Sequence, residues 1–245
     1  MFIHPINRVD TYKFSHPWIY PDDLEGVHAY IESRGGKYPY SVFFGLQALL
    51  REWQENPLTM KIVNRLEQRA IRHGLPFFRK GFVDIVNKFG GHFPVKVRAV
   101  AEGSVLPIRN VLVDIQETHP DFFWLPSYLE TQLLRAVWYP TTGCTRSHML
   151  KQVIKEGLIK SGNVANLPFK LHDFGARGVS SSESAQIGGA AHLVNFKGSD
   201  TWEAIEFINE YYMEDMAGEL FSLSKTVSGE LKGLSQWGNS LAFLV

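Results

Sequence analysis

Residues 169–212 restrict the fold of this chain more than any other segment, because short apolar runs alternate there with helical patterns. FKLHDF (169–174) and LVNF (193–196) predict short strands, whereas SSESAQIGGAAHL (181–193) and DTWEAIEFINEYY (200–212) predict helices. Parallel strands need a crossover connection between them, which is usually a helix. The order strand, helix, strand, helix therefore predicts parallel βα units and an α/β fold.

The first half of the chain also mixes the two patterns. Strands are predicted for VHAYIES (27–33), VKVRAVAEG (95–103) and VLVDIQ (111–116). Helical periodicity is present in SVFFGLQALLREW (41–53) and in NPLTMKIVNRLEQRAIRHG (56–74). An α/β arrangement therefore extends over most of the chain.

Particular residues predict where some helices begin and end. Pro57 suits the first turn of the second helix, and Gly74 suits its end. Ser127 followed by Glu130 matches a capping box, which opens a helix through LLRAVW. A separate helix is predicted over residues 146–160.

Composition excludes several classes of partner. The chain of 245 residues has 25 lysines and arginines against 25 aspartates and glutamates, so no charge excess indicates a nucleic acid or an anionic membrane. No apolar run is long enough to span a bilayer, and the first residues do not resemble a secretory signal. Cys144 is the one cysteine, so an internal disulfide is impossible. We expect a cytoplasmic protein that acts on a small molecule.

Two residues near the predicted end of the first short strand could bind a ligand. The ring of Phe174 could stack on a flat heteroaromatic ring, although an ordinary core phenylalanine is the alternative. Arg177 lies between small residues, where a phosphate could reach both its guanidinium and backbone N–H groups. An arginine in a surface turn is the alternative there.

A third candidate, Asp200, has a structural explanation that spacing alone favours. With Glu203 three residues later, it resembles a helix N-cap. His172 and His192 are twenty residues apart without a partner at ligand spacing, so we predict hydrogen-bonded core histidines and no metal site. The phosphate-binding motifs GxGxxG and GxxxxGK[ST] are absent.

Five segments of the chain form a characteristic series: DTYKFSH (10–16), VFFGLQALL (42–50), GGHFPVKVRAVAEGSVLPIRNVL (90–112), WLPSYLETQLLRAVWYPTT (124–142) and KLHDFGARGVSSSESAQIGGAAHLVNFKGSDT (170–201). In sequence and in order these segments resemble the nicotinamide phosphoribosyltransferase family, and the resemblance covers about residues 8–217.

The resemblance implies a fold similar to type II phosphoribosyltransferases, with an α/β sheet domain beside an irregular α/β barrel. It places the sheet domain at residues 1–135 and the first βα units of a partial, truncated barrel at residues 136–217, and leaves 218–245 as a divergent tail. The implied reaction transfers a phosphoribosyl group from phosphoribosyl pyrophosphate to nicotinamide, giving nicotinamide mononucleotide and pyrophosphate with Mg²⁺. The family is dimeric.

Four residues of this chain match the substrate-binding positions of the family. Phe174 would form one face of a nicotinamide sandwich, and Tyr12 from the partner subunit would form the other. Asp200 would accept a hydrogen bond from the carboxamide, which disfavours nicotinate, and Arg177 would bind phosphate or pyrophosphate oxygens. No catalytic residue is identified.

The later motifs of the family are absent. Family members have a phosphorylated histidine in a segment resembling AAEHS, used when ATP hydrolysis is coupled to turnover, and then RPDSG; neither is present here. We therefore expect a truncated form with low or no activity alone and without ATP coupling. The alternative is a noncatalytic nicotinamide-binding protein or dimer partner. The preference for nicotinamide over nicotinate stays open at this point.

Overall fold

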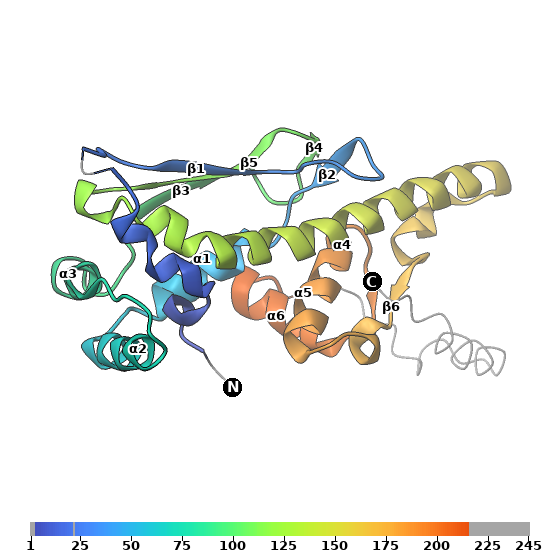
Figure 1. Cartoon of the computed structure of the whole chain (residues 1–245). Helices are drawn as coiled ribbons and strands as arrows, with labels where there is room; N and C mark the ends of the chain where they lie inside the picture. The colour runs from blue at the N-terminus through green and yellow to red at the C-terminus, as the bar shows by residue number, and fades with distance from the viewer. Residues whose placement is uncertain (1–2, 22, 216–245) are drawn as a thin grey trace. The chain divides into compact units, whose positions relative to one another are not determined.

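The computed structural model describes residues 3–21 and 23–215 (Figure 1). The described residues divide into two compact units: the first contains 3–21, 23–39, 48–101 and 107–136, and the second contains 40–47, 102–106 and 137–215. Both units contain helices and strands, so the α/β prediction is confirmed. The predicted tail, residues 218–245, lies outside the described residues.

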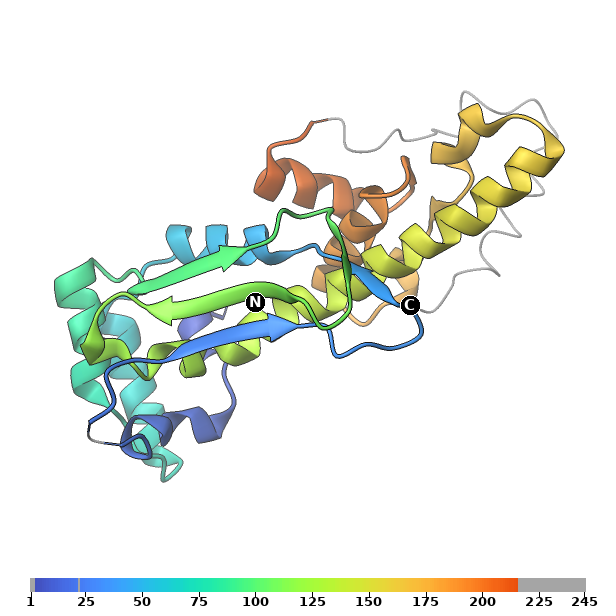
Figure 2. The same ribbon diagram turned by 90° about the horizontal axis from the view of Figure 1, so that it is seen from above.

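A three-stranded antiparallel sheet forms part of the first unit. Its strands are β1 (His28–Glu32), β3 (Val95–Ala99) and β5 (Val111–Glu117), in the order β1-β5-β3 (Figure 2). Ile115 of the central strand lies opposite Ala29 on one side and Val97 on the other. Leu112, Val113 and Ile115 are buried. All three strands were predicted, although β5 continues one residue beyond its predicted segment, to Glu117, and β3 stops at Ala99 rather than at residue 103.

The second predicted segment begins as a strand and only then becomes a helix. Strand β2 (Tyr40–Val42) pairs with β4 (Val105–Pro107), and α1 (Leu46–Glu55) follows Gly45, whose φ is +108°. Backbone N–H and C=O groups must form hydrogen bonds when they are buried. Here the strand pairing supplies these hydrogen bonds for residues 40–42, so a helix is not required at this point. The helical prediction is therefore wrong for the first residues of 41–53.

Helices α2 (Met60–Arg72) and α3 (Arg79–Phe89) of the first unit lie in the sequence between α1 and β3. Thr59, not Pro57, precedes α2 as its N-cap and accepts a hydrogen bond from the backbone N–H of Ile62. Gly74 follows α2 with a φ of +69°, a conformation that favours glycine. The predicted end of the helix is confirmed, whereas α3 was not predicted.

One continuous helix, α4 (Leu125–Ser161), replaces the two that were predicted. It passes through Pro140, although proline removes a helix hydrogen bond and usually ends a helix. Val137, Pro140, Thr141 and Cys144 are buried, so packing of this turn favours the helix over the local preference. Ser127 lies inside α4 and its hydroxyl contacts His16, so the predicted capping box is wrong.

Aromatic side chains make up much of the core of the first unit. Trp124 is fully buried, and its ring lies 4.9 Å from that of Phe82 and 5.4 Å from that of Tyr128. Phe77 stacks on Phe82 at a centroid distance of 4.9 Å and so extends this cluster. The core of this unit therefore depends on a few large side chains.

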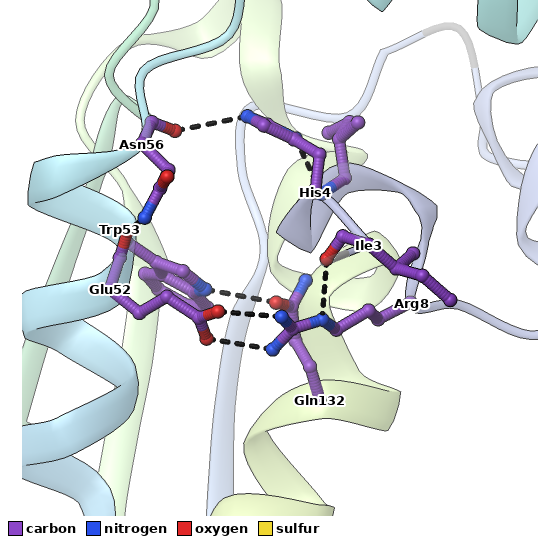
Figure 3. A network of polar contacts seen from close by, with 8 residues as sticks. Ile3, His4, Arg8, Glu52, Trp53, Asn56 and Gln132 are labelled. Atoms are coloured by element: carbon purple, nitrogen blue, oxygen red, sulfur yellow. Dashed lines mark hydrogen bonds and ion pairs between the residues drawn. The ribbon is translucent and has the colours of Figure 1, made fainter. Parts of the chain in front are cut away.

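The N-terminal residues are fixed to α1 by a polar network (Figure 3). Arg8 donates to both carboxylate oxygens of Glu52, at 2.7 and 2.5 Å, and also to the carbonyl of Ile3 at 2.9 Å. His4 Nε2 lies 3.0 Å from the carbonyl oxygen of Asn56 and donates to it. Bidentate Arg–carboxylate pairs restrict geometry as well as adding energy, so this segment has a defined position on the first unit.

The second unit contains the predicted βα units. Its elements are β6 (His172–Asp173), α5 (Ser182–Leu193), β7 (Gly198–Ser199) and α6 (Trp202–Tyr212), together with the C-terminal part of α4. Strands β6 and β7 pair in parallel, as predicted. The second strand begins at Gly198 rather than within 193–196, because α5 continues to Leu193 and the side chain of Asn195 donates to the carbonyl of Cys144 at 3.0 Å.

Short 3-10 helices are present in both units. They are Pro5–Asn7, Thr11–Phe14, His16–Trp18, Pro120–Phe122, Val164–Phe169 and Gly175–Gly178. None of the helices in the described ranges combines the length and apolar character needed to span a bilayer.

Two helical glycines of the second unit are expected to respond oppositely to alanine. A Cβ at Gly189 of α5 would lie 2.5 Å from Cβ of Ala204 on α6, whereas a Cβ at Gly157 of α4 would meet nothing within 4 Å. We expect Gly189→Ala to reduce the free energy of unfolding by about 1–3 kcal/mol through overpacking. Gly157→Ala should increase it by roughly 0.5–1 kcal/mol, since alanine favours helix. Denaturant titrations measure both, and equal effects would contradict close packing of α5 on α6.

Candidate substrate-binding site

The candidate site lies where β6 and β7 end side by side. His172 pairs with Gly198 and Asp173 pairs with Ser199 in the parallel register. The backbone N–H of Asp200 donates to the carbonyl of Asp173 at 2.8 Å, which joins the two strand ends. Carboxyl ends of parallel strands are where ligands usually bind in α/β folds.

His172 contacts both Phe174 and Asp200. Its Nε2 lies 2.9 Å from Oδ1 of Asp200, and its ring centroid lies 4.7 Å from that of Phe174 with a tilt of 37°. Phe174 is 38% exposed, and Asp200 is also exposed, so both can meet a ligand. His172 is hydrogen-bonded, as predicted, but it is half-buried at a strand end rather than in the core, and its partner was not predicted.

The predicted cap role of Asp200 is wrong. Thr201 is the N-cap residue of α6 and makes no side-chain cap hydrogen bond, while the carboxylate of Asp200 is held by His172. Glu203, the other half of the predicted cap, accepts a hydrogen bond from the hydroxyl of Ser182 on α5. The pairing between β6 and β7 therefore outweighs the local cap preference.

Asp173 shapes the turn that carries Phe174, and sequence reasoning missed it. Its Oδ1 accepts from the backbone N–H of Gly175 at 2.8 Å, and its Oδ2 accepts from the hydroxyl of Ser199 at 3.3 Å. The spacing of Asp173 and Gly175 is typical of an Asx turn, which is the signal that could have revealed this role. Burial and, to a smaller extent, the charge of Asp173 raise the pKa of Tyr139.

His192 forms a hydrogen bond with the backbone of β7. The carbonyl of Gly198 can only accept, so His192 Nε2, 3.2 Å away, must carry the proton, and Nδ1 accepts from the hydroxyl of Ser147 at 3.1 Å. The imidazole also stacks on Phe196 at 5.1 Å. Burial is the largest cause that lowers the pKa of His192, so the neutral form predominates in the folded protein.

This lowered pKa predicts that acid destabilises the protein. Below a pH of about 6.5 the unfolded chain binds a proton at His192 that the folded chain resists, so unfolding becomes more favourable as pH falls. We expect the free energy of unfolding to decrease from pH 7.5 to 5.5 in chemical denaturation. The decrease should be smaller in His192→Gln. An unchanged pH dependence in that variant would show that other groups, such as His4 and His16, whose pKa values burial also lowers, account for it.

Arg177 lies on the 3-10 helix Gly175–Gly178, three residues after Phe174, and is exposed. Helix α5 begins shortly afterwards at Ser182, with Ser181 accepting from the N–H of Ser184 at 3.1 Å. The arginine therefore lies on an exposed turn directly after the site. Its predicted contact with phosphate stays a prediction.

Tyr12 belongs to the first unit, where it protrudes from a well-held segment. It lies on the 3-10 helix Thr11–Phe14 and is 58% exposed. The neighbouring Lys13 is buried and forms an ion pair with Glu130, and Thr131 donates to Asp10 at 2.6 Å. The segment that carries Tyr12 is therefore held on α4, and the ring is exposed to solvent. The role of Tyr12 in a partner's site stays a prediction.

Within the described ranges no group of three or more histidine, cysteine, aspartate or glutamate side chains could hold a metal ion. The two carboxylates near the site are already engaged, Asp173 with Gly175 and Ser199, and Asp200 with His172.

Comparison with known proteins identifies the family. A model described as the nicotinamide phosphoribosyltransferase N-terminal domain matches residues 6–97, and one described as the nicotinate phosphoribosyltransferase family matches residues 169–242. A nicotinamide phosphoribosyltransferase of Xanthomonas campestris is 45% identical over 233 residues, which cover 94% of this chain. The chain belongs to the nicotinamide phosphoribosyltransferase family. The second match extends into residues 218–242, most of the tail that the sequence resemblance left out.

Other members of the nicotinamide phosphoribosyltransferase family are more distant. The Acinetobacter baylyi protein of that name is 29% identical over 228 residues, or 86% of this chain. The chain covers 48% of the Xanthomonas protein and 45% of the Acinetobacter protein, so it spans about half the length of these relatives.

A solved structure supports the fold of this family member. Human nicotinic acid phosphoribosyltransferase superposes with a TM-score of 0.54 at 19% identity, over 78% of this chain and 34% of the human chain. The chain therefore has the predicted type II phosphoribosyltransferase-like α/β fold.

Proposed function

We propose that this chain binds nicotinamide and acts in its phosphoribosylation, as a pentosyltransferase that forms nicotinamide mononucleotide and pyrophosphate from phosphoribosyl pyrophosphate. The names of its relatives support the reaction class. The observation that carries the proposal is the convergence of an exposed aromatic ring, Phe174, and an exposed carboxylate, Asp200, on one imidazole.

These two groups match the chemistry of a pyridine carboxamide. The ring of Phe174 offers a flat apolar face for the pyridine. Because His172 engages Oδ1 of Asp200, the second oxygen can accept from the carboxamide N–H₂. Nicotinate would place its own carboxylate against Asp200, and like charges repel at short distance. The arrangement therefore favours nicotinamide.

The sugar phosphate needs cationic and Lewis-acid partners. As pyrophosphate leaves, negative charge develops on its oxygens, and a nearby guanidinium stabilises it. Arg177, on the turn that follows Phe174, is the candidate for that contact. Mg²⁺ usually binds substrate phosphates with one or two carboxylates rather than a protein cage. We infer that Mg²⁺ is bound mainly through phosphoribosyl pyrophosphate.

The second face of the base would come from another copy of the chain. We propose a cytoplasmic homodimer in which Tyr12 covers the pyridine bound in the partner. An exposed ring on a segment held by the ion pair of the buried Lys13 with Glu130 suits this use, since a preorganised aromatic loses little entropy on binding. The free, buried thiol of Cys144 is compatible with a reducing compartment.

Calorimetry with the full chain tests base binding. Nicotinamide should give a saturable isotherm. Nicotinate, titrated at the same concentrations as the comparison ligand, should bind much more weakly. Phe174→Ala should weaken nicotinamide binding roughly 5- to 150-fold, the range for stacking of a base on an aromatic ring. Tyr30→Ala, which removes an exposed aromatic on β1, is the matched control. Equal binding of both pyridines would contradict the proposal.

Transfer is tested separately by formation of nicotinamide mononucleotide, of which we expect the chain alone to form little or none. The same preparation is incubated with nicotinamide, phosphoribosyl pyrophosphate and Mg²⁺, and the product is measured by chromatography. Omission of each substrate gives the background. Product that appears without phosphoribosyl pyrophosphate would argue against a transferase.

A further inference from the structure

We propose that His172 is a positioning residue that makes the site selective for a carboxamide, by fixing both the carboxylate of Asp200 and the ring of Phe174. This inference rests on the proposed function and names a residue that the base itself need not touch. Three features of the structure support it: a hydrogen bond, a ring contact and a glycine that leaves space for the imidazole.

The hydrogen bond determines the tautomer of His172. An ionised carboxylate can only accept, so the 2.9 Å contact between His172 Nε2 and Asp200 Oδ1 requires a proton on Nε2. The bond removes one of the two carboxylate oxygens from the site and restricts rotation of the group. One oriented acceptor remains, which is what a single N–H of a carboxamide needs.

The ring contact restrains the stacking surface. His172 and Phe174 lie at a centroid distance of 4.7 Å, within the range in which aromatic pairs attract each other. Phe174 is exposed and directly follows a strand of two residues, so packing leaves part of its ring uncovered. Movement of the imidazole would therefore misplace the stacking ring and the acceptor together.

Gly198 makes room for the imidazole. It is buried on β7 directly opposite His172 in the register, and a Cβ built on it would overlap Nδ1 of the imidazole. Because Nδ1 faces strand backbone, the ring cannot retreat from an added methyl without leaving Asp200. An alanine at position 198 should therefore displace His172 without changing any residue that we assign to the base.

The test compares substitutions that keep or remove the Nε2–H donor. His172→Phe keeps a ring but loses the donor, whereas His172→Gln can still present an N–H to Asp200. We expect His172→Phe to weaken nicotinamide binding about tenfold and to reduce the preference over nicotinate, because an unoriented carboxylate loses most of a hydrogen bond to a charged group. His172→Gln should recover part of both.

Gly198→Ala tests the same role of His172 without substituting His172 itself. It should weaken nicotinamide binding as His172→Phe does, and the double variant should be no weaker than either single variant, because residues acting through one contact are not additive. Gly157→Ala, in open space on α4, is the control. Additive losses, or unchanged binding in both single variants with circular dichroism unaltered, would overturn the positioning role. If His172→Phe fails to fold, Gly198→Ala and His172→Gln still decide.

A nitrogen-15 NMR spectrum of the imidazoles separates this inference from the proposed function. The unsubstituted chain should show the Nε2–H tautomer for His172, and Asp200→Ala should abolish that preference. An Nε2–H signal with no nicotinamide binding would refute the proposed function, and the selectivity role with it. Nicotinamide binding with an Nδ1–H tautomer would refute the positioning role alone.

Discussion

Asp200→Asn is expected to weaken nicotinamide binding roughly 10- to 150-fold, the loss for a hydrogen bond to a charged acceptor. The amide oxygen of asparagine can still accept from His172 Nε2, so the side chain should keep its direction. Only the acceptor that faces the base becomes an N–H donor. That donor suits a carboxylate, so nicotinate should bind more tightly to the variant than to the unsubstituted chain.

Calorimetric titration of both pyridines into both proteins measures this change of preference. Glu206→Gln is the matched control, because it makes the same chemical change at an exposed position of α6. It should leave both affinities unchanged. A fall in nicotinamide affinity with no gain for nicotinate would place Asp200 outside direct contact with the carboxamide.

Trp124→Ala is expected to lower the free energy of unfolding by about 3–5 kcal/mol, the usual loss for a large aromatic removed from a core. Trp124 is 0% exposed and packs on Phe78, Phe82 and Tyr128. The rings around it come from the start of α3 and from α4, so they cannot all close the space that the indole leaves. Loss of dispersion contacts then adds to the loss of apolar burial.

Chemical denaturation monitored by circular dichroism measures this effect. Trp202→Ala, at the start of α6, is the control, since Trp202 is 57% exposed. It should cost about 1 kcal/mol or less. Trp124→Phe should cost less than Trp124→Ala, because it keeps a ring and removes the indole N–H, which has no hydrogen-bond partner among the described residues. Equal losses in the two alanine variants would contradict a core centred on Trp124.

Local pattern predicted many of the elements but missed those that depend on tertiary contacts. The apolar alternation of β1 and β5 and the periodicity of α2 are properties of neighbouring residues, and the structure confirms them. The continuity of α4 through Pro140 is not local, because the buried residues of that turn stabilise the helix through their packing. The position of β7 depends on Asn195, which the backbone of Cys144 holds.

The candidate site shows the same division. Phe174, Arg177 and Asp200 could be selected from residue type, from their place after predicted strands and from the family resemblance. Asp173 and His172 could not be assigned their partners, because those partners are 26 and 28 residues away in Ser199 and Asp200. Register between parallel strands, which a sequence does not state, brings these groups within hydrogen-bond distance.

The sequence by itself determined the α/β class, the parallel βα order and the family, because periodicity and motif spacing are written in consecutive residues. The tertiary structure alone decided that Asp200 pairs with His172 instead of capping α6. A carboxylate at a helix start can accept from its own helix or from a distant donor, and the choice depends on which donor the fold brings closer. Here the pairing of β6 with β7 places the imidazole of His172 within hydrogen-bond distance of the Asp200 carboxylate.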